Sequence, residues 1–178
     1  MRVSISRSIA VMIASGLAAA LSLPMAASAD SPKTRTLELR DKCEATTFNA
    51  AFGPGFCTNT NGEVTADEFN AALAKGGHGG WWIRQRDITL DAGDSIQATD
   101  VGGIVHTFTE VAQFGKGCVP PFNVAVTETV DNCNFGRLVA TIVPQGATSA
   151  PEKLSVGVHK FQCLFHPWMR TTVTVRQP

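Results

Sequence analysis

Short segments of alternating polar and apolar residues, separated by turn signals, fill the chain after Trp81 and constrain its fold most strongly. The segments Asp87–Leu90 and Ser95–Ala98 alternate on either side of a Gly93-Asp94 turn. Further runs rich in valine and threonine follow at Val105–Val111, Val124–Val130, Leu138–Val143, Leu154–Cys163 and Thr171–Val175. Short strands with intervening turns are typical of antiparallel sandwiches and barrels. We therefore predict an all-β domain over residues 81–178.

The first 29 residues have the three parts of a secretory signal peptide. Arg2 and Arg7 form a positively charged start, Ile9–Leu23 is uncharged and apolar or small, and Ala27-Ser28-Ala29 matches an A-x-A cleavage site. A retained membrane anchor is the alternative, and the cleavage site disfavours it. No second apolar run of about 18 residues follows in the sequence. We expect a mature chain without a membrane span, exported across the inner membrane to the periplasm.

Residues 30–80 are predicted to form an N-terminal extension with one short helix. Thr65 and Glu68 have the spacing of a capping box, and apolar residues then recur at helical spacing until two glycines end the run. The pattern predicts a helix over Ala66–Lys75, followed by a flexible hinge over Gly76–Gly80.

The chain has five cysteines, an odd number for a protein expected in an oxidising compartment. Apart from Cys163, four remain, and four cysteines allow three pairings. The local pairing of Cys43 with Cys57 and of Cys118 with Cys133 would close two loops of about 15 residues, each worth roughly 3 kcal/mol in the chain-entropy model. This pairing would leave Cys163 free for another role.

Cys163, His166 and Met169 follow one another at C-x2-H-x2-M spacing. Zinc sites seldom use methionine, and iron–sulfur clusters need several thiolates. Copper accepts a thiolate, imidazoles and a weak axial thioether in one trigonal site. Such a site needs a second histidine, and His106, at the start of a strand after a Gly-Gly turn, is the candidate.

The stretch from Asp87 to Val175 resembles the cupredoxins, the small blue copper proteins of the amicyanin, pseudoazurin and plastocyanin type. Three motifs carry the resemblance: Cys-Leu-Phe-His-Pro-Trp-Met at 163–169, Gly-x-His-x-Phe-x-Cys at 157–163, and Gly-Asp-Ser-Ile at 93–96. The family fold is a Greek-key β-sandwich, so the resemblance implies this architecture, with the short helix lying in the N-terminal extension.

The resemblance also implies a ligand set and a function. One type 1 copper ion would be held by the ligands His106, Cys163, His166 and the weak axial Met169. Such a centre carries one electron, so we expect a monomeric electron carrier that binds redox proteins transiently and is not an enzyme. A copper-delivery protein without a redox role is the alternative. In the family, the edge of the second histidine reaches the surface in an apolar patch, which makes Pro167 and Trp168 candidate docking residues.

The remaining sequence features disfavour other classes of function. The chain has 15 Lys and Arg against 15 Asp and Glu, so it has no basic footprint for nucleic acid. Copper oxidases and nitrite reductases need additional histidine-rich centres, and only His78 and His159 remain besides the two candidate ligands.

Two further residues near the candidate ligands are expected to have structural roles or none yet assigned. His159 has the same strand parity as Cys163, and we expect it to point inward near the site in a structural role. Thr107 stands where the small family members often have an asparagine that ties the ligand loops together.

Overall fold

The computed structural model describes residues 31–124 and 126–177. The predicted signal peptide, residues 1–29, lies outside the described residues. Within the described part of the chain, no helix combines the length and the apolar character that crossing a membrane requires.

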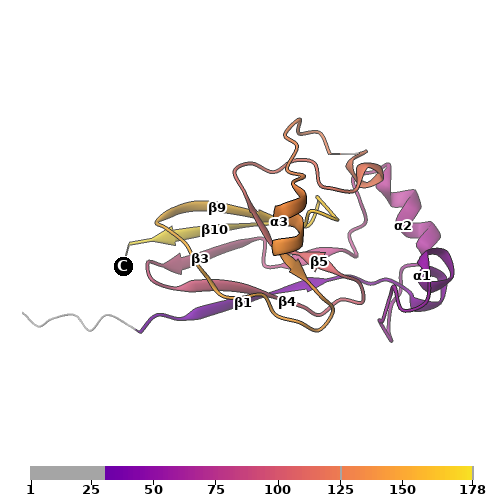
Figure 1. The fold of residues 1–178 in the computed structure, drawn as a ribbon, viewed down its shortest axis with the longest axis horizontal. Helices are drawn as coiled ribbons and strands as arrows, with labels where there is room; N and C mark the ends of the chain where they lie inside the picture. Colours follow the sequence, from indigo (N-terminus) through magenta and orange to yellow (C-terminus); the bar gives the residue numbers. More distant parts are fainter. Residues whose placement is uncertain (1–30, 125, 178) are drawn as a thin grey trace, which may run out of the picture. The chain divides into compact units, whose positions relative to one another are not determined.

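Two four-stranded sheets form the body of the domain (Figure 1). The first has the order β2 (Trp82–Arg84), β1 (Thr34–Arg40), β4 (Ser95–Asp100), β8 (Glu152–Lys153). The second has the order β3 (Asp87–Asp91), β10 (Arg170–Arg176), β9 (Gly157–Gln162), β6 (Thr109–Val111). A two-stranded sheet joins β5 (His106–Thr107) to β7 (Ile142–Val143). The predicted all-β sandwich is confirmed, with parallel pairs β1–β4 and β3–β10 among otherwise antiparallel ones.

Alternation along the strands builds the core, as the sequence pattern predicts. Strand β10 alternates between buried and half-buried residues, and its buried Val173 pairs in register with Ile88 of β3. The rings of Phe108 and Phe161 stack with their centroids 4.3 Å apart. Burying a large apolar side chain of this kind stabilises the fold by about 1.5–3 kcal/mol. The apolar faces of both sheets therefore form the interior.

The first strand of the predicted N-terminal extension belongs to the sandwich. Strand β1 lies between β2 and β4, and β4 pairs with it in parallel over six residue pairs. Residues from Ser31 onward form one compact unit, so the structure has no boundary at residue 80. The sequence could not show this, because β1 pairs with strands that begin more than 40 residues later in the chain.

The segment after β1 contains two short helices, α1 (Ala45–Phe52) and α2 (Ala66–Leu73), which lie together at one end of the sheets (Figure 1). Helix α2 matches the prediction, and the Thr65–Glu68 capping box is formed. Helix α1 was not predicted. Its N-terminal cap is Glu44, which accepts hydrogen bonds from two backbone N–H groups, whereas Ser, Thr, Asp and Asn are the usual signals.

Two predicted strands are wrong in the region between β6 and β8. The residues expected as a strand at 138–143 begin in helix α3 (Phe135–Ala140), because the Asn134 side chain caps that helix by accepting from the Arg137 N–H. Only β7 remains of the strand. Residues 126–130 alternate between half-buried and exposed but form no strand, and a 3-10 helix, η1 (Pro120–Asn123), precedes them.

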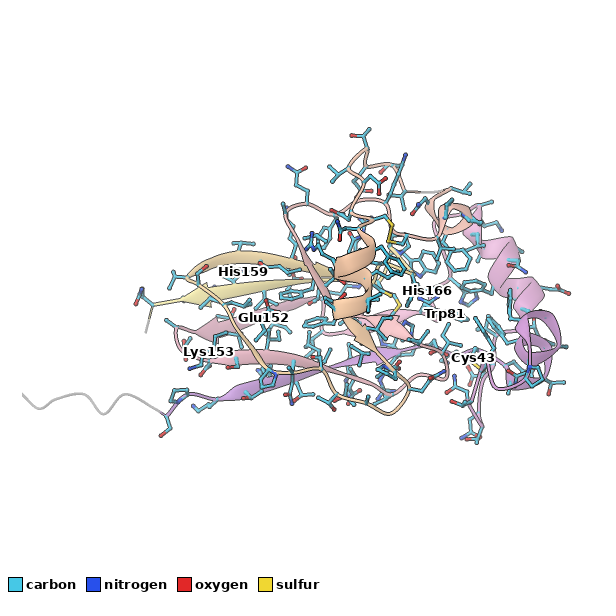
Figure 2. All side chains as sticks on the ribbon, viewed as in Figure 1. Cys43, Trp81, Glu152, Lys153, His159 and His166 are labelled. Carbon is cyan, nitrogen blue, oxygen red and sulfur yellow. A yellow bond between two sulfur atoms is a disulfide. The ribbon has the colours of Figure 1, made fainter. Side chains whose placement is uncertain are left out.

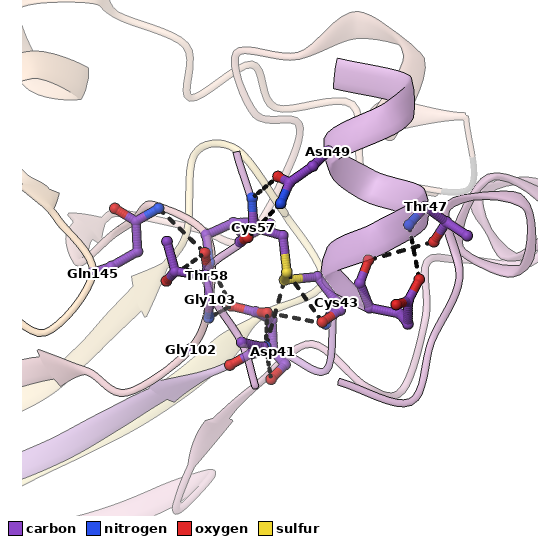
Figure 3. Close-up of a disulfide and its surroundings, with 12 residues drawn as sticks. Asp41, Cys43, Thr47, Asn49, Cys57, Thr58, Gly102, Gly103 and Gln145 are labelled. Carbon is purple, nitrogen blue, oxygen red and sulfur yellow. Dashed lines mark hydrogen bonds between the residues drawn. A yellow bond between two sulfur atoms is a disulfide. The ribbon is translucent and has the colours of Figure 1, made fainter. Parts of the chain in front are cut away.

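Two disulfides close the loops that local pairing predicts. Cys43 is bonded to Cys57 and Cys118 to Cys133, and the single free cysteine among the described residues is Cys163. The first bridge joins the segment before α1 to the loop after it (Figure 3). The odd count of cysteines is therefore resolved as the sequence suggested.

Candidate metal centre

His106, Cys163 and His166 converge in the interior from two distant parts of the chain. His106 begins β5, Cys163 follows the last residue of β9, and His166 lies on the loop before β10. Each is at most 3% exposed. Figure 2 places His166 next to Trp81, toward the end of the domain that carries the two helices. The structure thus brings together the three strong ligands that the sequence predicts.

The distances among the three donor atoms fit a single ion. The Cys163 Sγ lies 3.9 Å from the His106 Nδ1 and 3.6 Å from the His166 Nδ1. A trigonal ion with a metal–sulfur bond of about 2.3 Å and metal–nitrogen bonds of about 2.0 Å separates these atoms by about 3.8 Å. The three residues form a group whose ligand atoms lie within 4.8 Å of one another. The donor set and its spacing therefore suit one ion of the borderline-soft transition metals.

Met169 is fully buried at the end of the same loop. The loop is closed by two backbone hydrogen bonds: the Cys163 N–H donates to the Met169 carbonyl at 3.0 Å, and the Met169 N–H donates to the His166 carbonyl at 2.9 Å. The C-x2-H-x2-M spacing therefore forms a compact turn, and Met169 joins Cys163 in the hydrophobic core.

Thr107 ties the two ligand segments together. Its backbone N–H donates to the Cys163 Sγ at 3.3 Å, and its hydroxyl accepts from the Leu164 N–H at 2.7 Å. Hydrogen bonds of this kind orient ligands and tune a metal site. Thr107 thus links the ligand loops where the resembling family often has asparagine, a role that the sequence left unassigned.

Asp41 is a buried partner of the centre that sequence reasoning missed. Its Oδ2 lies 3.1 Å from the His106 Nε2, and both side chains are fully buried. Figure 3 shows Asp41 between the Cys43–Cys57 disulfide and the Gly102-Gly103 turn. Asp41 precedes His106 by 65 residues, and no local spacing links them. The one available signal is that Asp41 directly follows β1. The sequence pattern did not predict this strand, so the signal could not be used.

The three candidate ligands perturb one another's protonation. Burial raises the pKa of Cys163, but the hydrogen bonds from His106 and His166 outweigh burial and hold it well below its ordinary value. Burial lowers the pKa of His106, but the Asp41 carboxylate and the Cys163 sulfur outweigh burial and raise it to about 10. Burial lowers the pKa of His166. The pocket thus stabilises the thiolate, which is the form that binds metals.

Aromatic rings enclose His166. Its ring lies 5.6 Å from those of Phe122 and Trp168, 6.2 Å from Phe69 and 6.4 Å from Trp81, measured between centroids. We call these four residues the aromatic shell. Phe69 comes from α2, Phe122 from η1 and Trp168 from the ligand loop itself, so the shell joins segments that lie far apart in the sequence.

The expectation that the edge of His166 reaches the surface is wrong, because the shell covers it and leaves it 3% exposed. Of the two predicted docking residues, Pro167 is buried and Trp168 is half-buried. Gly77, at a φ of +93°, packs against the indole of Trp168, and a Cβ at this position would lie 2.1 Å from the ring. The predicted hinge over Gly76–Gly80 is therefore part of the packing around the site.

His159 does not join the candidate ligands. Its Nδ1 lies 2.6 Å from the Glu110 Oε1 and its Nε2 lies 2.8 Å from the Ser155 carbonyl oxygen. These two partners occupy both ring nitrogens. The structural role predicted for His159 fits this arrangement, but the expectation that it lies near the site is wrong, since Figure 2 places it away from His166.

Comparison with known proteins gives matches among solved structures only. No family model matches the chain, and no curated protein matches it. A purple cupredoxin from Nitrosopumilus maritimus is 16% identical, with 79% of this chain and 98% of that one covered and a TM-score of 0.41. A reduced amicyanin variant, in which phenylalanine replaces a proline, is 16% identical over 51% of this chain and 70% of that one, with a TM-score of 0.33. A Cu(I) amicyanin variant, in which alanine replaces a methionine, is 14% identical over 53% and 73%, with a TM-score of 0.36.

The matched structures belong to the family that the sequence resembles. At 14–16% identity, the likeness to them is one of fold. The functional conclusion therefore depends on the side chains of this chain: a buried thiolate and two imidazoles, spaced for one ion.

Proposed function

We propose that this protein binds one copper ion in a type 1 centre and carries one electron between transiently bound redox proteins. The observation that supports this most directly is the spacing of the Cys163 sulfur from the two imidazole nitrogens, 3.6 and 3.9 Å, in a fully buried pocket. Copper would supply the one-electron couple when bound.

The donor set favours copper over zinc. Structural zinc sites are closed by four strong tetrahedral ligands, usually cysteine and histidine. Here the described residues group only three such donors, His106, Cys163 and His166, and the fourth nearby candidate is the thioether of Met169. A trigonal His2Cys set with a weak axial methionine is the ligand pattern of blue copper.

The chain's own contribution to electron transfer is rigidity. His106 is fixed by the pairing of β5 with β7, and Cys163 by the end of β9 and the closed ligand loop. The Thr107 hydrogen bonds connect the two segments. Ligands that cannot move hold the same geometry for both oxidation states, so little reorganisation accompanies the transfer.

The alternative, copper delivery without a redox role, fits the structure less well. A protein that hands its metal to a partner needs ligands that the partner can reach, and all three strong ligands are buried. The two disulfides support the proposed oxidising, periplasmic compartment. We propose that electrons cross the aromatic shell and that Trp168, half-buried, is the docking residue a partner touches. Pro167 would support the ligand loop from within.

The visible and electron paramagnetic spectra of the copper-loaded protein test this proposal. We expect intense visible absorption from thiolate-to-copper charge transfer and a reversible one-electron potential. Cys163→Ser should abolish the colour, because it removes the thiolate, whereas His78→Ala should leave it unchanged. Met169→Gln should retain copper and lower the potential, as expected for a weak axial ligand. A colourless Cu(II) protein, or intense colour retained in Cys163→Ser, would refute the proposal.

A further inference from the structure

We propose that Asp41 is a positioning residue of the copper centre, fixing His106 in the tautomer that offers Nδ1 to the metal and lowering the reduction potential of the bound ion. This inference rests on the proposed function. It also gives Asp41, which directly follows β1 in the predicted N-terminal extension, a direct role at the site.

The two nitrogens of His106 face different partners. Nε2 lies 3.1 Å from the Asp41 Oδ2, whereas Nδ1 lies 3.9 Å from the Cys163 Sγ. A neutral imidazole carries one proton, and the carboxylate accepts it at Nε2. Nδ1 is then left with its lone pair toward the metal position. A ligand histidine that donates its other N–H to a carboxylate is oriented and made more basic by that bond.

Asp41 is itself held rigidly. Its Oδ2 also accepts from the backbone N–H groups of Gly103 at 2.8 Å and Ile104 at 3.1 Å. Its Oδ1 accepts from the Cys43 N–H at 3.1 Å and the Asn59 amide at 2.9 Å. These donors hold the carboxylate in one orientation and compensate its charge, which a buried anion requires.

The turn opposite Asp41 is shaped to admit the carboxylate. A Cβ added at Gly102 would lie 2.0 Å from the Asp41 Oδ2. A side chain at this position would displace the carboxylate from His106. The glycine therefore permits the close approach that lets two consecutive backbone N–H groups, those of Gly103 and Ile104, reach the same oxygen. Figure 3 shows Gly102 and Gly103 beside Asp41.

The sign of the effect on the potential follows from charge. A fixed carboxylate behind a ligand imidazole interacts more favourably with Cu(II) than with Cu(I), because the oxidised ion carries the larger charge. This interaction is strong in the buried pocket, where water screens little. Asp41 therefore stabilises the oxidised state and lowers the potential.

Asp100 provides a matched control. It is also fully buried, and one of its ligand atoms lies within 4.8 Å of those of Asp41 and His106. Its Oδ1 accepts from the Gly102 N–H at 2.8 Å, and within the described residues its Oδ2 has no hydrogen-bond partner. Asp100→Asn therefore removes a nearby carboxylate without removing the bond to His106.

The experiment compares the reduction potentials of copper-loaded wild type, Asp41→Asn and Asp100→Asn by spectroelectrochemistry. In Asp41→Asn we expect the ratio of Cu(II) to Cu(I) affinity to fall about tenfold, which is a rise in potential of ~59 mV for one electron. Asp100→Asn should shift the ratio less, by about threefold at most, because the Asp100 carboxylate makes no hydrogen bond to His106 and so does not orient this imidazole or raise its basicity. An unchanged potential in folded Asp41→Asn, or an equal shift in Asp100→Asn, would overturn the inference.

A second measurement needs neither a variant nor copper redox chemistry. Nitrogen-15 NMR of the Zn(II)-loaded wild type reports which His106 nitrogen keeps its proton. We expect a protected Nε2–H and metal at Nδ1, and the reverse arrangement would refute the assignment even if Asp41→Asn fails to fold. Failure of the proposed function would appear differently, as a wild-type protein without thiolate-to-copper absorption.

Discussion

Phe69 of α2 is the member of the aromatic shell whose removal tests the packing most directly. It is 2% exposed, and its ring lies 4.5 Å from that of Trp81, 5.3 Å from Phe122 and 5.7 Å from Phe48. Truncation of a buried phenylalanine to alanine costs about 3–5 kcal/mol. Because rigid rings surround the site, the cavity can collapse little, which favours the upper half of this range.

One effect acts in the opposite direction. Alanine is the best helix former and phenylalanine is worse by roughly 0.5 kcal/mol, so α2 itself gains from the substitution. The Thr65 capping box is untouched. We therefore expect Phe69→Ala to lower the free energy of unfolding by about 3.5 to 4.5 kcal/mol. At roughly 2–4 °C per kcal/mol for a domain of this size, the melting temperature should fall by about 10 °C.

Denaturant unfolding of the metal-free, disulfide-intact protein measures this loss. The matched control is Phe52→Ala on α1, whose ring also contacts Phe48 but is 46% exposed. This control should lose about 1 kcal/mol. A loss in Phe69→Ala no larger than that of Phe52→Ala would refute the claim that the shell is tightly packed. In the copper-loaded protein, Phe69→Ala should also speed oxidation by ferricyanide, since the cavity opens beside His166.

Two further predictions concern the loop over Trp168 and the pair formed by His159. Gly77→Ala should destabilise the fold by about 2 kcal/mol and alter Trp168 fluorescence, because it adds a Cβ at positive φ against the indole; Gly79→Ala, where a Cβ meets nothing within 4 Å, should do neither. Burial lowers the pKa of His159, but hydrogen bonds to the Glu110 carboxylate and a backbone carbonyl outweigh burial and leave the pKa raised above 6.5. The pair thus stabilises the fold at pH values below the pKa of His159 in the unfolded chain, and this stabilisation is lost as the pH rises through its pKa in the folded protein. His159→Gln should therefore lower the free energy of unfolding near pH 5.5 and change it little near pH 8.5. A loss of stability that does not change with pH would contradict this.

The fold could be predicted where local pattern and tertiary structure agree. Alternation identified β3, β4, β9 and β10, and the capping box at Thr65 identified α2. The prediction failed where a polar side chain decides the backbone, as at Asn134, which starts helix α3 ahead of the apolar run expected as a strand at 138–143. It also failed at β1, whose role as a central strand depends on partners far along the chain.

The candidate site was likewise predicted only in part from the sequence. Cys163, His166 and Met169 stand within seven residues, so their spacing alone indicates the chemistry. His106 could be chosen only because the ligand set needs a second histidine and this one begins a predicted strand after a Gly-Gly turn. Asp41 and Phe69 could not be found, because each reaches the site from a segment whose position is set by long-range pairing and by the Cys43–Cys57 disulfide.

The N-terminal segment acts on both sides of the centre, which changes how the metal is approached. Asp41 lies behind His106, away from the metal position, and Phe69 lies over His166. An exposed histidine edge would let a partner contact a ligand directly, whereas the aromatic shell adds at least one ring between the ligand and any partner. The rate of electron exchange with a partner should then depend on how closely the rings of the aromatic shell pack, as well as on the surface that the partner contacts. The segment that contacts the first histidine thus also covers the second, together with Phe122 of η1 and Trp168 of the ligand loop.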